Sequence, residues 1–190
     1  MKKILLKMLL LILLAGFLIL PAGCLPEEEE EEEFDEAALV AVDSYIREMT
    51  EALGDTTLRA DLLGWEREYY RPDEPPFSYD EERRQWLAEH KEELQALRRS
   101  HVEGANFPAE EDIADWEVVV VRGEREWMLY GEEVIWALDL VDDLYGEVIA
   151  VIDLIIDNEG ELDVPQSERV LELVEIIDPV IEEARSVLIR

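Results

Sequence analysis

Three carboxylates on one predicted helix have the spacing of a candidate cation site. Asp139, Asp143 and Glu147 are each four residues apart, and Asp142 lies beside them. Side chains four residues apart on a helix are neighbours on one face, so adjacent pairs could offer oxygen ligands to a hard cation such as Ca²⁺. The same stripe is also typical of the water-facing side of an otherwise apolar helix. Both interpretations stay open from the sequence alone.

A second acidic segment, DNEGELD at 157–163, alternates acids around a glycine, as calcium-binding loops do. When Gly160 is aligned with the invariant glycine of an EF-hand, Ile155 takes the first ligand position and Gln166 the twelfth. Two required carboxylates are therefore missing. The pattern favours a helix end followed by a turn.

The two histidines of the chain, His90 and His101, are eleven residues apart. On one helix this spacing places both on the same side but separates them by a rise of about 16 Å, so they cannot bind one metal ion. Each falls on the apolar line of its helix, which favours a histidine at the edge of the core that is hydrogen-bonded to a neighbour. The motifs of zinc proteases and di-iron carboxylate proteins are missing around both.

Motifs for nucleophilic or phosphate chemistry are missing as well: the chain has no GxSxG, no phosphate-binding loop with its lysine and no GxGxxG. Because acids are abundant, a pair of carboxylates for hydrolysis could be placed almost anywhere. A carboxylate-dependent hydrolase therefore stays an alternative, while no catalytic residue and no cofactor are predicted.

Aromatic residues gather in the middle of the sequence, around the proline-rich segment 71–77. Together they could line a groove for a sugar or a peptide, although aromatic residues more often pack in cores and under loops. The residues concerned are Trp65, Tyr69, Tyr70, Phe77, Tyr79, Trp86, Trp116, Trp127 and Trp136.

The first residues have the composition of an export signal. Three lysines precede a run of 13 apolar or small residues, Met8 to Leu20. This run is shorter than the about 20 residues of a membrane-spanning helix and fits the apolar region of a secretory signal peptide. The small residues Ala22 and Gly23 then stand directly before Cys24, the single cysteine of the chain.

This junction resembles the lipobox of bacterial lipoproteins. In that family the cysteine thiol receives a diacylglyceryl group, the leader is cut directly before the cysteine, and the modified cysteine becomes the new N-terminus. The resemblance covers residues 1–24 and implies lipidation of Cys24, with Ala22 and Gly23 as the cleavage motif. It further implies an exported chain, anchored by lipid to the outer face of a bacterial cell membrane or to the outer membrane. An uncleaved short anchor from Met8 to Leu25 is the alternative.

Acidic residues dominate the remainder. The chain has 49 acidic and 17 basic residues, a formal charge of −32, and cleavage before Cys24 would change it to −35 by removing three lysines. This charge repels nucleic acid, whose phosphates require Lys and Arg, so nucleic-acid binding is excluded. It also repels anionic headgroups, and the seven glutamates at 27–33 predict a spacer in which residues 25–33 reach at most about 30 Å.

Helical periodicity organises the exported part. We expect a first helix capped by Asp35 and ended by Gly54, a second from about Asp55 to Pro72, and a third from a Ser78/Glu81 capping box to about His101. Residues 132–157 are apolar around well over half of the helix circumference and predict the central helix. The last two helices are expected at 164–177 and 179–188, with a break at Asp178 and Pro179.

Four consecutive valines before Gly123 and Glu124 favour a hairpin, 116–121 against 126–130, although a helix could cover its second half. The predicted architecture is a mainly α compact bundle with one short β-hairpin around 116–130. The expected organisation is a signal peptide (1–23), the lipidated cysteine and acidic spacer (24–33), and one helical globular domain (34–190).

The predicted function is that of a membrane-anchored envelope lipoprotein. Its acidic helical domain is expected to act as a binding or interaction module for a protein or cation ligand that the sequence does not identify. A calcium-responsive module and an envelope hydrolase are the alternatives.

Overall fold

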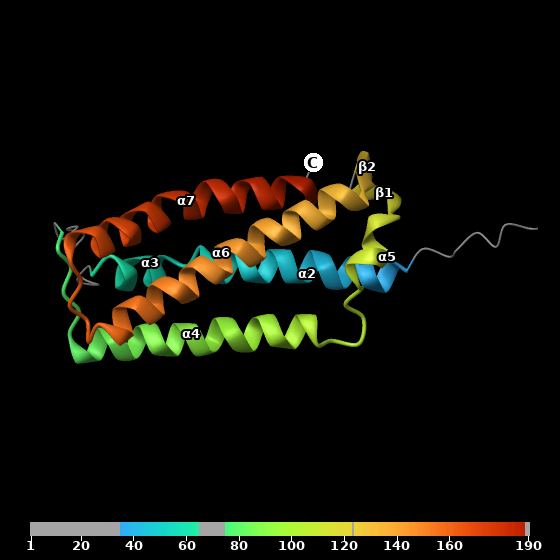
Figure 1. Ribbon diagram of the computed structural model, residues 1–190. Coiled ribbons are helices and arrows are strands. Elements are labelled where there is room, and N and C mark those ends of the chain that lie inside the picture. The colour runs from blue at the N-terminus through green and yellow to red at the C-terminus, as the bar shows by residue number, and fades with distance from the viewer. Residues whose placement is uncertain (1–34, 65–74, 123, 189–190) are drawn as a thin grey trace, which may run out of the picture. The chain divides into compact units, whose positions relative to one another are not determined.

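A computed structural model describes residues 35–64, 75–122 and 124–188 of the chain. In these residues, four long helices lie side by side and alternate in direction along the chain (Figure 1). Two short helices and a two-stranded antiparallel hairpin accompany them, which confirms the mainly α bundle with one hairpin. The elements are α2 (Glu36–Leu53), α3 (Thr56–Leu62), α4 (Glu81–Val102), α5 (Glu110–Ala114), β1 (Glu117–Arg122), β2 (Arg125–Tyr130), α6 (Gly131–Asp157) and α7 (Val164–Leu188).

The first two helices begin where the capping residues predict. The Asp35 carboxylate accepts hydrogen bonds from the first backbone N–H groups of α2, and Asp55 does the same for α3. The prediction that the second helix continues to Pro72 is wrong, because α3 ends at Leu62 and Gly64 takes a left-handed φ of 68°. Residues 65–74, among them three of the aromatic residues of the predicted groove, lie outside the described residues.

The predicted Ser78 cap of α4 is also wrong, because Asp80 takes that role by accepting from the backbone N–H of Arg83 at 2.8 Å. Ser78 instead donates to Glu161 at 2.8 Å. Around this contact, segments 77–79 and 160–162 are joined by backbone hydrogen bonds of 2.9 and 3.1 Å. The DNEGELD segment is thus a helix end and turn, as predicted.

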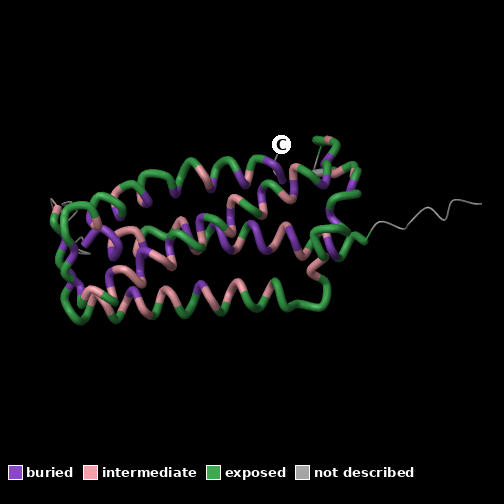
Figure 2. The backbone as a smooth tube through the Cα atoms, viewed as in Figure 1, coloured by how far each residue is buried: buried purple, intermediate pink, exposed green. Residues whose placement is uncertain are grey.

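Helix α6 is central, because it contacts each of α2, α4, α5 and α7. Its buried residues recur along its length, and Figure 2 shows the buried positions of the long helices turned toward the interior of the bundle. Phe77, Tyr79 and Trp116 are also buried, so these three aromatic residues belong to the core rather than to a groove.

The prediction of two final helices is wrong, because α7 runs unbroken from Val164 to Leu188 with Pro179 inside it. A proline within a helix removes one backbone hydrogen bond and costs about 3 kcal/mol or more. Ile177 and Ile181, on either side of it, are both buried in the core, and this packing offsets the loss. Asp178 pairs with Arg59 at 2.7 Å instead of capping a new helix.

Helices that combine the length and the apolar composition needed to cross a membrane do not occur in the part of the chain that the structure describes.

Candidate binding site

The β-hairpin presents an apolar face to solvent. Its register pairs Val119 with Met128 and Val120 with Trp127. Because successive strand residues point to opposite faces, four valines in a row cannot all face the bundle. Val118 and Val120 are half-buried, whereas Val119 and Val121 are 50% and 65% exposed. Figure 2 shows exposed residues along much of the hairpin.

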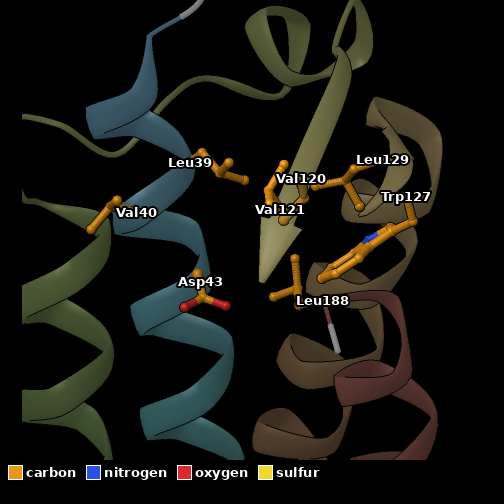
Figure 3. Close-up of a pocket in the computed structure, with 8 residues that line it drawn as sticks. All are labelled: Leu39, Val40, Asp43, Val120, Val121, Trp127, Leu129 and Leu188. Carbon is orange, nitrogen blue, oxygen red and sulfur yellow. The ribbon is translucent and has the colours of Figure 1, made fainter. Parts of the chain in front are cut away.

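A small apolar recess lies between the hairpin, the start of α2 and the end of α7. Leu39 and Asp43 line it from α2, Val121 and Trp127 from the hairpin, and Leu188 from α7 (Figure 3). Its volume is about 150 Å³, below the about 300–1,000 Å³ of sites for small molecules. The recess is therefore suited to one or two side chains of another chain.

Two polar groups stand out in this apolar lining. Asp43 brings the one carboxylate among the lining residues, on the side of α2 that faces the recess (Figure 3). The Trp127 indole Nε1 is buried and has no hydrogen-bond acceptor among the described residues. Val40, which is 58% exposed, also lines the recess from α2 and adds to its apolar surface.

The outer edge of β1 is open. In an antiparallel ladder, every second residue directs its N–H and C=O groups away from the partner strand. Within the described segments, β1 has no backbone hydrogen bond to any element other than β2. An unpaired edge is a template for pairing with a further strand. The edge and the recess share residues Val120 and Val121, so one occupant could contact both.

Acidic residues surround this surface. The segment 109–133, which forms α5, the hairpin and the start of α6, has nine acids and two arginines. Residues 35–43 at the start of α2 add three acids and no base. The apolar face is therefore set in a strongly negative part of the molecule.

A second hollow of about 510 Å³ lies between the end of α2, α3 and α4, and His90 is one of the residues that line it. The His90 Nε2 lies 3.2 Å from the carboxylate of the fully buried Asp61. Burial alone would raise the pKa of Asp55 in the same hollow, but hydrogen bonds from the N–H groups of Thr57 and Leu58 outweigh it and hold that pKa below its usual value.

A His–Asp pair can orient an imidazole for general base catalysis, but a nucleophile must also reach the ring. Thr57 lines the hollow, yet no hydrogen bond joins its side chain to His90 in the described chain. His101 bonds Glu48 at 3.1 Å, so both histidines are bonded to a neighbour at the core edge, as predicted. The hydrolase alternative stays a prediction.

The carboxylate stripe of α6 is divided among several partners. Asp139 and Asp143 are exposed, and Glu147 pairs with Arg169 of α7 at 3.0 Å. Asp142 and Asp153 reach α4, where they pair with Arg98 and Lys91. A grouping of three or more acids, histidines or cysteines able to hold a metal ion is not found in the described ranges.

The calcium-responsive alternative therefore gains no support from this geometry and stays a prediction. Thermal unfolding in millimolar Ca²⁺ and in EDTA tests it, because a cation that binds only the native state must raise the melting temperature.

Asp142 is also the acceptor for a buried phenol. The Tyr45 hydroxyl donates to it, and Arg98 binds it through two nitrogens at 3.2 and 3.0 Å. Burial, together with the bond to this carboxylate, raises the pKa of Tyr45 above its usual range. The same carboxylate raises the pKa of Arg98, whose guanidinium lies 5.4 Å from the centre of the Tyr145 ring. This cluster joins α2, α4 and α6 and is structural in character.

No protein family, curated protein or solved structure matches this chain. The predicted lipidation site Cys24 and the predicted cleavage residues Ala22 and Gly23 lie outside the described residues.

The sequence predicts the hairpin but no function for it. A signal was present, because a short two-stranded hairpin with four consecutive valines must expose every second one unless another layer covers it. The contributions of Leu39, Asp43 and Leu188 could not be found in this way, since they come from helices distant in sequence.

Proposed function

We propose that this protein is an exported lipoprotein, held by acyl groups on Cys24 at the outer face of a bacterial cell membrane or at the outer membrane, and that its helical domain is a binding module. The anchor is supported by the basic start, the short apolar run and the Ala22-Gly23-Cys24 junction. Two or more acyl chains give stable attachment, so the domain itself needs no membrane-binding surface.

The observation that carries the binding role is the apolar face of the hairpin, which none of the described elements covers. Val121 is 65% exposed beside a recess lined mainly by apolar side chains. Exposed apolar surface rimmed by polar groups marks interaction sites on soluble domains. Binding therefore takes place at the hairpin, the start of α2 and the end of α7, and the bound part is a segment of another protein.

The anchor is tested by feeding cells that express the chain a palmitate analogue with an alkyne tail. The wild-type chain incorporates the label and has lost residues 1–23 by intact mass, whereas Cys24→Ser does neither. Equal labelling of the two chains contradicts lipidation at this residue, and an unacylated wild type with an intact leader supports the uncleaved anchor.

The binding role is tested separately by photo-crosslinking the full chain in neutral detergent with a neutral peptide of alternating Ser and Val that carries a diazirine. Cross-links are expected in the hairpin and the start of α2. Cross-links confined to other helices contradict this location, whatever the result for the anchor.

A further inference from the structure

The outer edge of β1 and the adjoining recess favour one kind of occupant. Strand addition uses the main-chain groups of an open edge for affinity and pockets for alternate side chains for specificity. Both parts are present here, because β1 offers six residues whose outer edge pairs with no other described segment and the recess beside it admits one or two apolar side chains. An extended segment satisfies both, whereas a helix would leave the main-chain groups of the edge unpaired.

The charge around the site favours an occupant with a positive net charge. Nine acids against two arginines in 109–133 create a negative potential, and Asp43 extends it into the recess itself. A positive partner is attracted at a distance and a negative one is repelled. On an added strand, basic side chains on the outer face would lie beside Glu117 of β1, which is exposed.

Charge also argues against a second copy of this chain on the same edge. Two copies would bring together the same acidic ends, each on a chain of formal charge −32. The repulsion is strongest at low ionic strength and is progressively screened as the Debye length falls, to about 8 Å at physiological salt and about 3 Å at 1 M.

We infer that the β1 edge and its recess bind a cationic, extended protein segment with alternating apolar and basic residues, which adds to the hairpin as a third strand. The apolar side chains of this segment enter the recess beside Leu39 and Trp127, and its basic side chains face the surrounding carboxylates. This inference rests on the proposed binding role and specifies the chemistry of the partner.

Fluorescence anisotropy with the full chain in neutral detergent tests the inference. Three eight-residue peptides with blocked ends are compared: alternating Lys and Val, alternating Ser and Val, and alternating Glu and Val. The Lys peptide is expected to bind at least tenfold more tightly than the Ser peptide at low salt, with a smaller difference at high salt. Equal binding of the Lys and Ser peptides overturns the cationic preference but leaves the binding role standing.

Strand addition is tested by N-methylating the Lys peptide on alternate residues, in both frames, which removes the N–H donors of one edge at a time. At least one of the two methylated peptides is expected to bind at least tenfold more weakly. If both bind as tightly as the parent, pairing with the β1 edge is wrong.

Matched variants locate the site. Val121→Ser is expected to weaken binding of the Lys peptide at least tenfold. Val164→Ser, at an exposed valine that begins α7, is expected to leave the affinity unchanged. Asp43→Asn is expected to weaken binding of the Lys peptide several-fold and to leave binding of the Ser peptide unchanged. Asp143→Asn removes the same charge from an exposed position on α6 and is expected to change the affinity for neither peptide. Equal effects within either pair overturn the assignment.

Two further outcomes distinguish a failure of the cationic partner from a failure of the proposed binding role. If none of the peptides binds, the binding role of the recess fails together with the inference. If sedimentation shows a dimer of the full chain that Val121→Ser disperses, a second copy occupies the edge and the cationic partner is wrong.

Discussion

Helix α4 and the β-hairpin attach to the same bundle in opposite ways. Helix α4 spans 22 residues but fully buries only Leu87 and Leu94. Leu97 packs half-buried against the core, and polar pairs add further contacts on the inner side of the helix. Lys91 and Arg98 reach Asp153 and Asp142 of α6, while the two histidines of α4 reach α3 and α2. The hairpin, by contrast, has apolar surface that nothing in the described chain covers.

The difference between α4 and the hairpin follows from the positions of the few basic residues. Five of the basic residues lie on α4, which lets this helix approach the acids of its neighbours. The hairpin end has two arginines among nine acids, so it keeps its negative charge and its exposed valines together. In this acidic chain, the basic residues therefore allow α4 to pack on the bundle through ion pairs, whereas the hairpin keeps an exposed apolar surface.

The largest effect is expected where the hairpin joins α6. A Cβ on Gly131 would overlap the backbone oxygen of Ile113, and the Gly131 N–H already bonds the Trp116 carbonyl at 2.8 Å. Gly131→Ala is therefore expected to lower the free energy of unfolding by about 4 kcal/mol or more, measured by urea denaturation.

Gly146 provides the matched control for that variant, because a Cβ there meets nothing within 4 Å. Gly146→Ala should raise the stability by about 0.5–1 kcal/mol. A tolerated Gly131→Ala would show that the hairpin is not seated against α5 and α6 as described.

The next effect contrasts the two regions directly. Leu87→Ala empties a fully buried position in the small apolar contact of α4 and is expected to cost about 2–5 kcal/mol. Val121→Thr keeps the β-branched shape at an exposed hairpin position and should stay within about 0.5 kcal/mol. Chemical denaturation measures both, and a large loss for Val121→Thr would mean that this residue is covered in the folded protein.

A smaller effect tests the ion pairs of α4. Arg98→Met removes the two bonds to Asp142 and is expected to cost about 1–2 kcal/mol. Arg99→Met removes the same charge one residue later, from an exposed position, and should change stability by less than about 0.5 kcal/mol. The losses of unfolding free energy in Arg98→Met and Arg99→Met are compared at low and high salt. Equal losses would mean that Arg98 acts through the overall charge of the protein rather than through its pair with Asp142.

The smallest effect is a pH dependence. Because its pKa is raised in the folded state, Tyr45 contributes stability that is complete below pH about 10 and is lost as the pH rises above that value. Tyr45→Phe is expected to be about 1 kcal/mol less stable at pH 8, and the gap to the wild type should narrow by pH 11. Denaturation at both pH values measures the gap, and a constant gap would contradict the buried phenol.

Local patterns in the sequence sufficed for much of the fold. Asp35 and Asp55 cap helices that begin at the very next residue, and the composition of 132–157 predicts its central position. The unbroken α7 could not be predicted from the Asp178-Pro179 pair, because the burial of Ile177 and Ile181 decides it.

The candidate site was less predictable for the same reason. The partners of Asp142 lie 44 and 97 residues away in the sequence, so the sequence could not distinguish an ion-paired carboxylate from a water-facing one. The recess is built from α2, both strands and the end of α7, and only the packed bundle brings these segments together.

Hydrogen exchange of the full chain, with and without the Lys and Val peptide, measures which surface of the protein the peptide covers. Slower exchange is expected at alternate amides of β1 when the peptide is added, with no change along α4. Binding that leaves β1 unprotected, or that protects α4 instead, would contradict the claim that the hairpin edge is the open surface of this protein.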